Sequence, residues 1–349
     1  MRSILLDLER MKYPNTGLYH YCSSLATHLL KHKHADEGFQ LFIPKALKGS
    51  FGDQVRYITL QLHSKLYMTG TRDVQVWHMT HQQSKYYPVN ANTKMVLTIH
   101  DLNYLHESDS ERRKNKYNAM VLKGIERANI ITCISEFVKK DVMQNLATFG
   151  KPVKVIYNGC SFQDIEPEYI PTYIPAKPFL FSLGIIGPKK NFHVVPSILP
   201  SLDAELIISG TPYGDYNKKI MAEAKKFGVE DRVHLTGPVS EKDKNWYLKN
   251  CKAFIFPSLA EGFGLPVLEA MYYGKPVFLS RLTSLPEVGG EHAYYFDNFL
   301  PEHMRDVFEK GMHHYETTHP QELIKAWAMR FSWDNTAREY LSIYRKLRP

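Results

Sequence analysis

The stretch from Ala253 to Gly274 (AFIFPSLAEGFGLPVLEAMYYG) constrains the fold more than any other part of the chain. Its first residues are apolar, end at a proline and are long enough for one buried strand. A turn with two glycines follows, and then a helical pattern that has Pro266 in its first turn and stops at Gly274. This order of strand, glycine-rich turn and helix is typical of a phosphate site, because the turn amides and the positive helix end face the anion.

Two glutamates flank the turn, Glu261 at its start and Glu269 on the helix. A carboxylate beside a phosphate cradle does not bind the phosphate itself. It accepts hydrogen bonds from sugar or ribose hydroxyls. The alternative is an ordinary strand-to-helix turn, with glycines for backbone geometry and glutamates on a solvated face. A ligand site is favoured because both carboxylates, the proline and the end of the helix all stand at the positions that such a site needs.

The pattern Glu261-Gly-Phe-Gly-Leu-Pro-x-x-Glu269 resembles the Glu-x7-Glu motif of the retaining GT-B glycosyltransferases, specifically glycosyltransferase family four. The resemblance implies that Glu261 is catalytic and contacts the donor sugar, whereas Glu269 holds the ribose of the nucleotide. The donor diphosphate is then expected to lie against the backbone amides of the turn, which belong to Gly262, Phe263, Gly264 and Leu265.

The same resemblance assigns roles to two side chains elsewhere in the chain. His100 follows the apolar run 94–99 and matches a histidine of the family. It is expected to be catalytic and to donate a hydrogen bond to a sugar hydroxyl or a leaving oxygen. Lys190, in the turn after the predicted strand 179–184, is expected to neutralise the diphosphate. A histidine or lysine in such a place without the motif is more often structural.

Two further donor contacts are implied in turns. Gly17 is expected to lie under the donor phosphates, and the backbone at Val239 is expected to contact the nucleobase. The chain departs from the family pattern at Asn15, which replaces the first glycine of a Gly-x-Gly-x-Tyr turn, and at Ile185, where many members have an arginine. Neutralisation of the diphosphate therefore depends more heavily on Lys190 and the helix after Gly264.

Predicted strands and helices alternate on both sides of the proline-rich segment 166–178, which divides the chain almost in half. The predicted fold class is α/β with the GT-B architecture, two Rossmann-like, doubly wound parallel-sheet domains facing a cleft. The domains are 1–168 (N-terminal, acceptor side) and 178–330 (C-terminal, nucleotide-sugar binding), and 331–349 is a helix expected to cross back to the N-terminal domain. The predicted strands are 2–8, 39–44, 55–60, 74–78, 94–99, 128–134, 153–157, 179–184, 204–209, 232–235, 253–256 and 276–279, and 286–290 is predicted as a tight loop.

The loop after the predicted strand 74–78 is polar. A loop at the carboxyl end of a strand is where α/β sheets place ligands. The side chains at the end of this strand and in the loop 79–87 are therefore candidates for acceptor contacts, namely His78, His81, Gln82 and Gln83.

The chain is basic, with a formal net charge of +8, most of which comes from its first half. The predicted helix 108–127 carries six Lys and Arg residues, which suits an anionic membrane surface, although a solvated surface helix fits equally well. No apolar run approaches the ~20 residues of a membrane span. The N-terminus does not read as a signal peptide, and the four cysteines are scattered. We expect a cytoplasmic protein that touches the inner face of the plasma membrane peripherally.

Together these features predict a hexosyltransferase that acts with retention of configuration. The donor is expected to be a nucleotide-diphosphate sugar. GDP-mannose is favoured by similarity to bacterial mannosyltransferases, and a UDP-sugar comes next. The acceptor is expected to be a hydroxyl of a glycan or lipid-linked glycan, in lipopolysaccharide O-antigen or capsule synthesis. The resemblance also implies attack on the same face of the sugar, with the leaving phosphate oxygen accepting the proton of the acceptor.

No cofactor and no metal are expected, because the sequence has neither an Asp-x-Asp motif at a strand end nor an evident cluster of metal ligands. The alternatives are a GT-B sugar-nucleotide epimerase and a non-catalytic sugar-binding protein. The Glu-x7-Glu spacing argues against the first, and the phosphate-binding turn argues against the second. Nucleic acid is not an expected partner, since no basic stripe is interleaved with aromatic residues.

Overall fold

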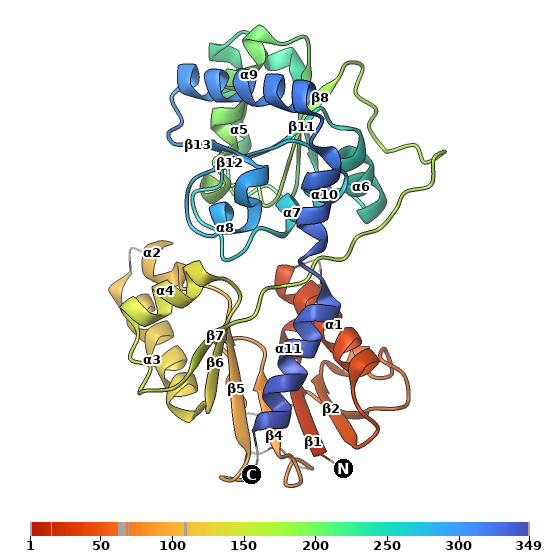
Figure 1. Cartoon of the computed structure of the whole chain (residues 1–349). Coiled ribbons are helices and arrows are strands. Elements are labelled where there is room, and N and C mark those ends of the chain that lie inside the picture. Colours follow the sequence, from red (N-terminus) through yellow and green to blue (C-terminus); the bar gives the residue numbers. More distant parts are fainter. Residues whose placement is uncertain (1, 15, 62–67, 69, 108–109, 348–349) are drawn as a thin grey trace. The chain divides into compact units, whose positions relative to one another are not determined.

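Figure 1 shows the computed structural model of the chain, which describes residues 2–14, 16–61, 68, 70–107 and 110–347. The chain divides into two compact units. Unit 1 consists of Met1–Gly159 together with Ser332–Pro349, and unit 2 is Cys160–Phe331. Both units are α/β, and each is described below by itself.

The described part of unit 1 contains a seven-stranded parallel sheet with the order β3-β2-β1-β4-β5-β6-β7. The interior strand β1 is fully buried at Ile4, Leu5 and Leu6, as expected for a strand covered on both faces. The strand order reverses between β1 and β4, and α/β sheets bind ligands beside such a reversal. The strands are β1 (Arg2–Asp7), β2 (Glu37–Ile43), β3 (Arg56–Thr59), β4 (Val76–Met79), β5 (Lys94–Ile99), β6 (Ile130–Cys133) and β7 (Val153–Val155).

Helices pack on this sheet, and the last helix of the chain, α11, is one of them. In Figure 1, α11 lies against α1, and a hydrogen bond of 3.1 Å joins the hydroxyls of Tyr21 and Tyr340. The basic helix predicted over 108–127 begins at Glu111, because the Ser110 hydroxyl accepts from the amide of Arg113 and caps it. The helices are α1 (Gly17–His32), α2 (Asn103–Glu107), α3 (Glu111–Arg127), α4 (Glu136–Asn145) and α11 (Trp333–Lys346), with 3-10 turns at Glu9–Lys12 and Lys45–Leu47.

A buried hydrogen-bond network joins α11 to the sheet. The two ring nitrogens of His78 on β4 lie 2.6 Å from the Tyr344 hydroxyl and 2.7 Å from Oγ1 of Thr98. Thr98 in turn bonds to the Tyr340 hydroxyl at 2.9 Å. His78 is therefore a core residue, and its interpretation as an acceptor contact is wrong. It is fully buried inside β4, so it cannot belong to the loop that follows that strand.

The described part of unit 2 contains a six-stranded parallel sheet with the order β10-β9-β8-β11-β12-β13. The order again reverses beside the first strand of the sheet, between β8 and β11. Leu180 on β8 pairs with Leu206 on one side and Ala253 on the other. The strands are β8 (Phe179–Leu183), β9 (Glu205–Ser209), β10 (Val233–Gly237), β11 (Ala253–Phe256), β12 (Val277–Ser280) and β13 (Tyr294–Phe296).

The helices of unit 2 alternate with its strands as predicted, but one predicted loop is helical. Residues 286–290, predicted as a tight loop, lie largely in the short helix α8. Pro286 is the second residue of this helix, where a proline is well tolerated. The segment Phe192–Ser201 is a 3-10 helix whose two prolines lack the amide that an α-helix needs. The α-helices are α5 (Tyr216–Lys226), α6 (Glu241–Asn250), α7 (Leu265–Tyr272), α8 (Leu285–Gly289), α9 (Pro301–Thr318) and α10 (Gln321–Met329), with further 3-10 turns at Pro188–Lys190, Glu230–Arg232 and Gly290–His292.

The proline-rich segment 166–178 belongs to unit 2. Two buried carboxylates hold it there. Asp243 accepts hydrogen bonds from Tyr169 and Thr172, and Glu205 accepts from the Tyr173 hydroxyl and from two backbone amides. The prolines of this segment suggest a connector, but its polar side chains and backbone amides attach it to unit 2. No helix in the described part of the chain is long and apolar enough to cross a membrane.

The His78 network predicts how the stability of unit 1 depends on pH. Burial lowers the pKa of His78 to about 3, so the folded chain keeps this ring neutral while the unfolded chain protonates it near its ordinary value of 6.5. The resulting stability is present above pH 6.5 and is lost as the pH falls towards 3. We expect His78→Gln to reduce the slope of unfolding free energy against pH by about 1.4 kcal/mol per unit below pH 6.

Urea unfolding followed by pulsed hydrogen exchange of β4 and β5 measures this slope in unit 1 alone. Burial raises the pKa of Asp7 to about 7, which contributes the opposite slope, but wild type and variant share that contribution. His20→Gln, at an exposed position on α1, is the matched control. Equal slopes for wild type and His78→Gln would contradict the account of the network.

Candidate active site

The glycine-rich turn of unit 2 has the predicted strand–turn–helix geometry. The strand β11 is fully buried, and α7 begins at Leu265 with Pro266 in its first turn. Gly264 caps α7 with φ at +113°, in the left-handed region that favours glycine. A Cβ on Gly264 would also stand 2.9 Å from Cδ2 of Leu285, so a larger residue would displace the turn.

Two hydroxyl side chains from the segment after β12 hold the turn in shape. Oγ of Ser284 donates to the carbonyl oxygens of Glu261 at 3.0 Å and Phe263 at 2.8 Å. Oγ1 of Thr283 accepts a hydrogen bond of 3.0 Å from the amide of Glu261. The sequence analysis missed both residues, because nothing near them in the sequence marks their partners.

The structure brings Lys190 and Glu261 together. Nζ of Lys190 lies 2.5 Å from Oε1 of Glu261, and Oγ of Ser258 donates to the same oxygen at 2.5 Å. The two side chains are only 16% and 13% exposed, so their charges are poorly hydrated and depend on each other. The ammonium group also lies 4.5 Å from the centre of the Phe256 ring. The groups predicted for the diphosphate and for the donor sugar thus meet at one point.

A second glycine and a backbone contact position Lys190. Gly184, just after β8, has φ at +145°, and a Cβ there would lie 2.9 Å from Cε of Lys190. The amide of Leu259 donates to the carbonyl of Lys189 at 2.8 Å, which joins the lysine turn to the loop after β11. A side chain on the residue after β8 would therefore crowd the lysine stem, and glycine leaves room for it.

Glu269 has a lysine of its own. Nζ of Lys244, on α6, lies 2.8 Å from Oε1 of Glu269 and 2.8 Å from Oε2 of Glu241. Burial by itself would lower the pKa of Lys244, but the two carboxylates outweigh it and raise that pKa above its usual value. Lys244 was not predicted. It becomes a candidate for holding the Glu269 carboxylate in place.

Val239 lies in the wall of a pocket of about 660 Å³ within unit 2. The pocket is also lined by Thr236 and Pro238 from the same turn, and by the rings of Tyr173 and Tyr247. The nucleobase contact of the Val239 backbone stays a prediction.

In unit 1, His100 lies at the end of β5 as predicted, and its hydrogen bonds define its tautomer. Its Nε2 lies 2.8 Å from the carbonyl oxygen of Thr80, which can only accept, so Nε2 carries the proton. The ring packs edge-on against Tyr21 at 4.5 Å between centres, and burial lowers the pKa of His100. In this neutral form the free lone pair is on Nδ1. A sugar hydroxyl would therefore donate to His100, whereas the sequence analysis expected the histidine to donate.

The other candidates in unit 1 differ in what they contact. Gly17 is the first residue of α1, and a Cβ there would meet no atom within 4 Å. Asn15 lies outside the described residues. Gln82 donates from Nε2 to the carbonyl of Asp101 at 2.8 Å, and Nδ1 of the buried His81 accepts from the amide of Gln83 at 3.1 Å.

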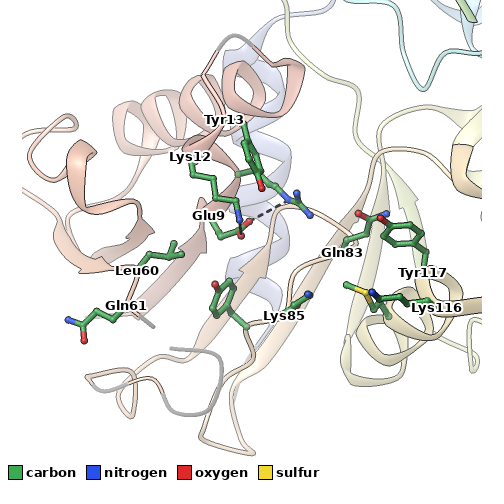
Figure 2. A pocket seen from close by; sticks show the side chains of 12 residues that line it. Glu9, Lys12, Tyr13, Leu60, Gln61, Gln83, Lys85, Lys116 and Tyr117 are labelled. Carbon is green, nitrogen blue, oxygen red and sulfur yellow. Dashed lines mark hydrogen bonds and ion pairs between the residues drawn. The ribbon is translucent and has the colours of Figure 1, made fainter. Parts of the chain in front are cut away.

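A pocket of about 560 Å³ lies in unit 1 where the segments after β1, β3 and β4 meet α3 (Figure 2). Four of its side chains are cationic, and its buried carboxylate, Glu9, pairs with Lys12 and Arg10. Lys85 and Lys116 pair with no carboxylate among the described residues, so the pocket is positive. Its lining consists of Glu9, Arg10, Lys12, Tyr13, Leu60, Gln61, Gln83, Lys85, Tyr86, Lys116, Tyr117 and Met120.

Comparison with known proteins gives two family matches, one for each part of the chain. Residues 172–326 match the model of the group 1 glycosyl transferases, and residues 55–163 match the model of glycosyltransferase family 4. Each model covers less than half of the chain, and together the two matches show that the chain is similar to glycosyltransferases along most of its length. The Glu261–Glu269 motif and Lys190 lie inside the first match, and His100 lies inside the second.

Two curated relatives of the chain are mannosyltransferases of Escherichia coli. The serotype-specific mannosyltransferase WbdA is 30% identical over 274 residues, which cover 71% of this chain and 33% of WbdA. The chain thus spans about a third of the length of that relative. The O-antigen chain mannosyltransferase B is 24% identical over 99% of this chain and 100% of its own length.

Among solved structures, HepE of Anabaena in complex with UDP and glucose is similar to this chain with a TM-score of 0.72. The alignment covers 99% of this chain and 100% of HepE at 17% identity. The likeness and the two parallel-sheet α/β units confirm the GT-B fold class. The individual roles of the site residues stay predictions.

If Glu261 and Glu269 have the roles that the motif predicts, neutralising each of them is expected to change different kinetic constants. Glu261→Gln should lower mainly kcat, by about 100-fold or more, because the carboxylate would stabilise charge that develops at the sugar in the transition state. Glu269→Gln should chiefly raise the donor KM, by about 10- to 100-fold, because the ribose does not change during the reaction. Steady-state kinetics of both variants measures the difference.

Glu302→Gln, which neutralises an exposed carboxylate of the same unit on α9, is the matched control. Circular dichroism establishes that each variant is folded. Wild-type kinetics in both active-site variants would make the Glu261–Glu269 turn a structural element only.

Proposed function

We propose that the protein transfers a hexose, with retention, from a nucleotide-diphosphate donor to a hydroxyl of a glycan or lipid-linked glycan. GDP-mannose is the favoured donor, a UDP-sugar is the second candidate, and the product belongs to a surface polysaccharide such as an O-antigen or a capsule. The half-buried Lys190–Glu261 pair carries this proposal. It puts a cation for the diphosphate and a carboxylate for sugar hydroxyls at one point, next to the positive end of α7.

Donor binding would exchange the partners of this pair. The diphosphate offers more negative charge than one carboxylate, so it competes for Lys190 and leaves Glu261 without its ammonium partner. A half-buried carboxylate that loses its counter-charge needs new donors, and the hydroxyls of the donor sugar provide them. Ser258 keeps its hydrogen bond to Oε1 and maintains the direction of the carboxylate.

In the proposed reaction the acceptor oxygen forms a bond to the anomeric carbon while the bond from that carbon to the diphosphate oxygen breaks. The leaving phosphate oxygen takes the proton of the acceptor hydroxyl, so no protein base is needed. Glu261 is not assigned the role of a covalent nucleophile, because the proposed same-face attack forms no covalent intermediate with the protein. Same-face attack is consistent with a single carboxylate at the sugar.

The names of the relatives support the choice of sugar. WbdA and the O-antigen chain mannosyltransferase B are both mannosyltransferases, and the second aligns along its whole length. HepE was solved with UDP and glucose, which keeps a UDP-sugar as the second candidate. Because this chain spans only a third of WbdA, mannose transfer and the polysaccharide remain part of the proposal.

We place the acceptor in the positive pocket of unit 1 and assign it a negative charge. Tyr13 and Tyr117 in the lining offer ring surface for a sugar, and the cations offer partners for a phosphate (Figure 2). Lys116 comes from α3, the basic helix whose charge suits an anionic membrane surface and fits a solvated surface equally well. A glycan carried on a phosphate-linked lipid would satisfy both features.

The donor is tested by thermal unfolding with a panel of GDP-mannose, GDP, UDP-glucose and UDP. The preferred donor at 100 times its dissociation constant is expected to add ~2.7 kcal/mol of stability. Lys190→Gln should remove most of that gain. Excess chelator should not, because we assign the diphosphate to Lys190 and the end of α7 rather than to a divalent cation.

Three outcomes would contradict these assignments. A UDP-sugar that stabilises more than GDP-mannose would replace the favoured donor. Turnover that is lost in chelator and restored by Mg²⁺ or Mn²⁺ would overturn the metal-independent site. Stabilisation by none of the four nucleotides would overturn the proposed function.

The acceptor pocket is tested with Lys116→Gln. This substitution should raise the KM for a phosphate-linked glycan acceptor by about 10-fold or more and leave the donor KM unchanged, since a charged hydrogen bond is worth ~1.5–3 kcal/mol. Lys123→Gln is the matched control, because Lys123 lies on the same helix, is exposed and stacks on Tyr87 rather than lining the pocket. Equal effects of the two variants would indicate general attraction to the charged helix and would contradict the pocket.

A further inference from the structure

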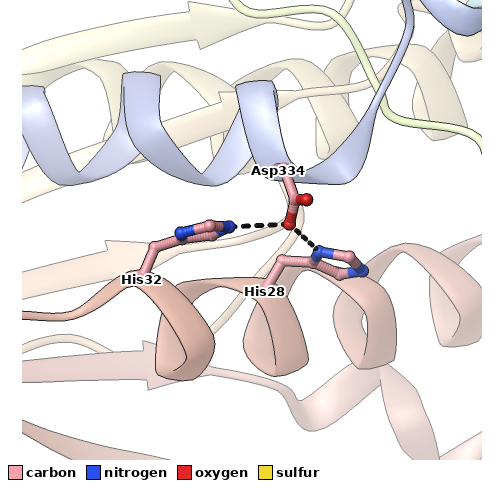
Figure 3. Close-up of side chains that lie close together, drawn as sticks. All are labelled: His28, His32 and Asp334. Atoms are coloured by element: carbon pink, nitrogen blue, oxygen red, sulfur yellow. Dashed lines mark hydrogen bonds and ion pairs between the residues drawn. The ribbon is translucent and has the colours of Figure 1, made fainter.

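Three potential metal ligands from two helices of unit 1 meet at one point (Figure 3). His28 and His32 lie four residues apart on α1, so their rings project from the same face of the helix, one turn from each other. Asp334 lies in the first turn of α11 and points between them. The sequence alone gives no sign of the grouping, because Asp334 is separated from the histidines by most of the chain.

The ligand atoms are already close enough to share an ion. Nδ1 of His28 and Nε2 of His32 each lie 2.7 Å from the same Oδ1 of Asp334. One candidate ligand atom from each of the three residues lies within 4.8 Å of the others. Nitrogen and oxygen ligands around a tetrahedral Zn²⁺ stand about 3.4 Å apart, so the rings need only small movements to admit the ion.

The packing of α1 on α11 holds this geometry without any ion. The ring of Tyr21 on α1 lies 5.6 Å from that of Trp333, the residue before Asp334, and the Tyr21 hydroxyl bonds to Tyr340. The Ser332 hydroxyl caps α11 by accepting from the amide of Asn335 at 3.2 Å. Both helices thus present their ligands from well-packed elements, as a preformed metal site requires.

We propose that His28, His32 and Asp334 form a binding site for a divalent transition metal, Zn²⁺ being the best fit. Two imidazoles and one carboxylate are a typical ligand set for zinc, and water would fill the fourth position. The three side chains are between 20% and 32% exposed, which leaves a path for the ion and the water.

Lys31 competes with the metal for the same carboxylate. Its Nζ lies 3.1 Å from both Oδ1 and Oδ2 of Asp334, and a nearby ammonium group repels a dication. The lysine side chain is 57% exposed, so it can swing into solvent when the ion enters. The lysine therefore lowers the affinity of the site without closing it.

The proposed ion would fasten the last helix of unit 1 to its first helix. Ser332, just before the ligand Asp334, is where the chain re-enters unit 1 after unit 2, so the ion would hold the start of the returning segment. Because an ion that binds only the folded state shifts folding by mass action, zinc should stabilise unit 1. This role does not depend on the proposed transfer reaction.

The test uses the full chain, purified without a histidine tag and stripped of metal by a chelator. Calorimetry with Zn²⁺ is expected to give one site per chain, and Co²⁺ in its place should give the visible absorption of a tetrahedral complex. His28→Gln and His32→Gln should each weaken zinc binding by at least about 10- to 100-fold. Loss of a residue that only hydrogen-bonds to a metal ligand already has an effect of that size. His20→Gln, an exposed histidine on the same helix, should leave the affinity unchanged.

Lys31→Gln separates the metal site from a purely hydrogen-bonded cluster. A metal site predicts a higher zinc affinity, because the competing ammonium is gone. A hydrogen-bonded cluster predicts a lower melting temperature and no gain in affinity. Equal zinc binding by wild type, His28→Gln and His32→Gln would overturn the proposal. Nucleotide binding, measured on the same samples, is expected to be independent of all four substitutions.

Discussion

The half-buried ion pair of Lys190 and Glu261 is the interaction on which the site in unit 2 depends. Neither side chain is well hydrated, so each needs the other when no ligand is present. The surrounding sequence accommodates the pair. Gly184 lets the lysine stem pass the end of β8, the Phe256 ring lies beside the ammonium, and Ser258 orients the carboxylate. A ligand that satisfies both charges would replace the pair at little electrostatic cost, and a sugar linked to a diphosphate does so.

Unit 1 is organised differently, around polar groups that are hydrogen-bonded to one another in its core. His78, Thr98 and the tyrosines of α11 satisfy one another's hydrogen bonds inside the core. The low pKa of His78 keeps the network neutral. His100 is also buried, but it lies at the end of its strand. Among the described residues, its ring has one hydrogen-bond partner, the carbonyl of Thr80, which accepts from Nε2. The contrast shows why a position inside a strand gives a structural histidine, and a position at its end gives a candidate for the site.

Much of the fold was predictable because the strands of both sheets are apolar runs bounded by polar turns. The Glu261–Glu269 turn was predictable because its residues are close in sequence. Lys244, Ser284 and Asp334 were not, since each finds its partner on another element and carries no local signal. His78 was misread because a polar residue near a strand end resembles a ligand contact, although the strand continues to Met79. Sequence patterns identified the local motifs, and only packing revealed their partners.

The most direct test of the central claim is the affinity of nucleoside diphosphates for Glu261→Gln. If Lys190 must leave Glu261 to bind the diphosphate, neutralising the glutamate removes a competitor and should strengthen GDP binding, measured by calorimetry with UDP in parallel. Turnover with the intact donor should fall in the same variant. Unchanged or weaker binding of both nucleotides by Glu261→Gln would contradict the exchange of partners and the place of the ion pair at the centre of the site.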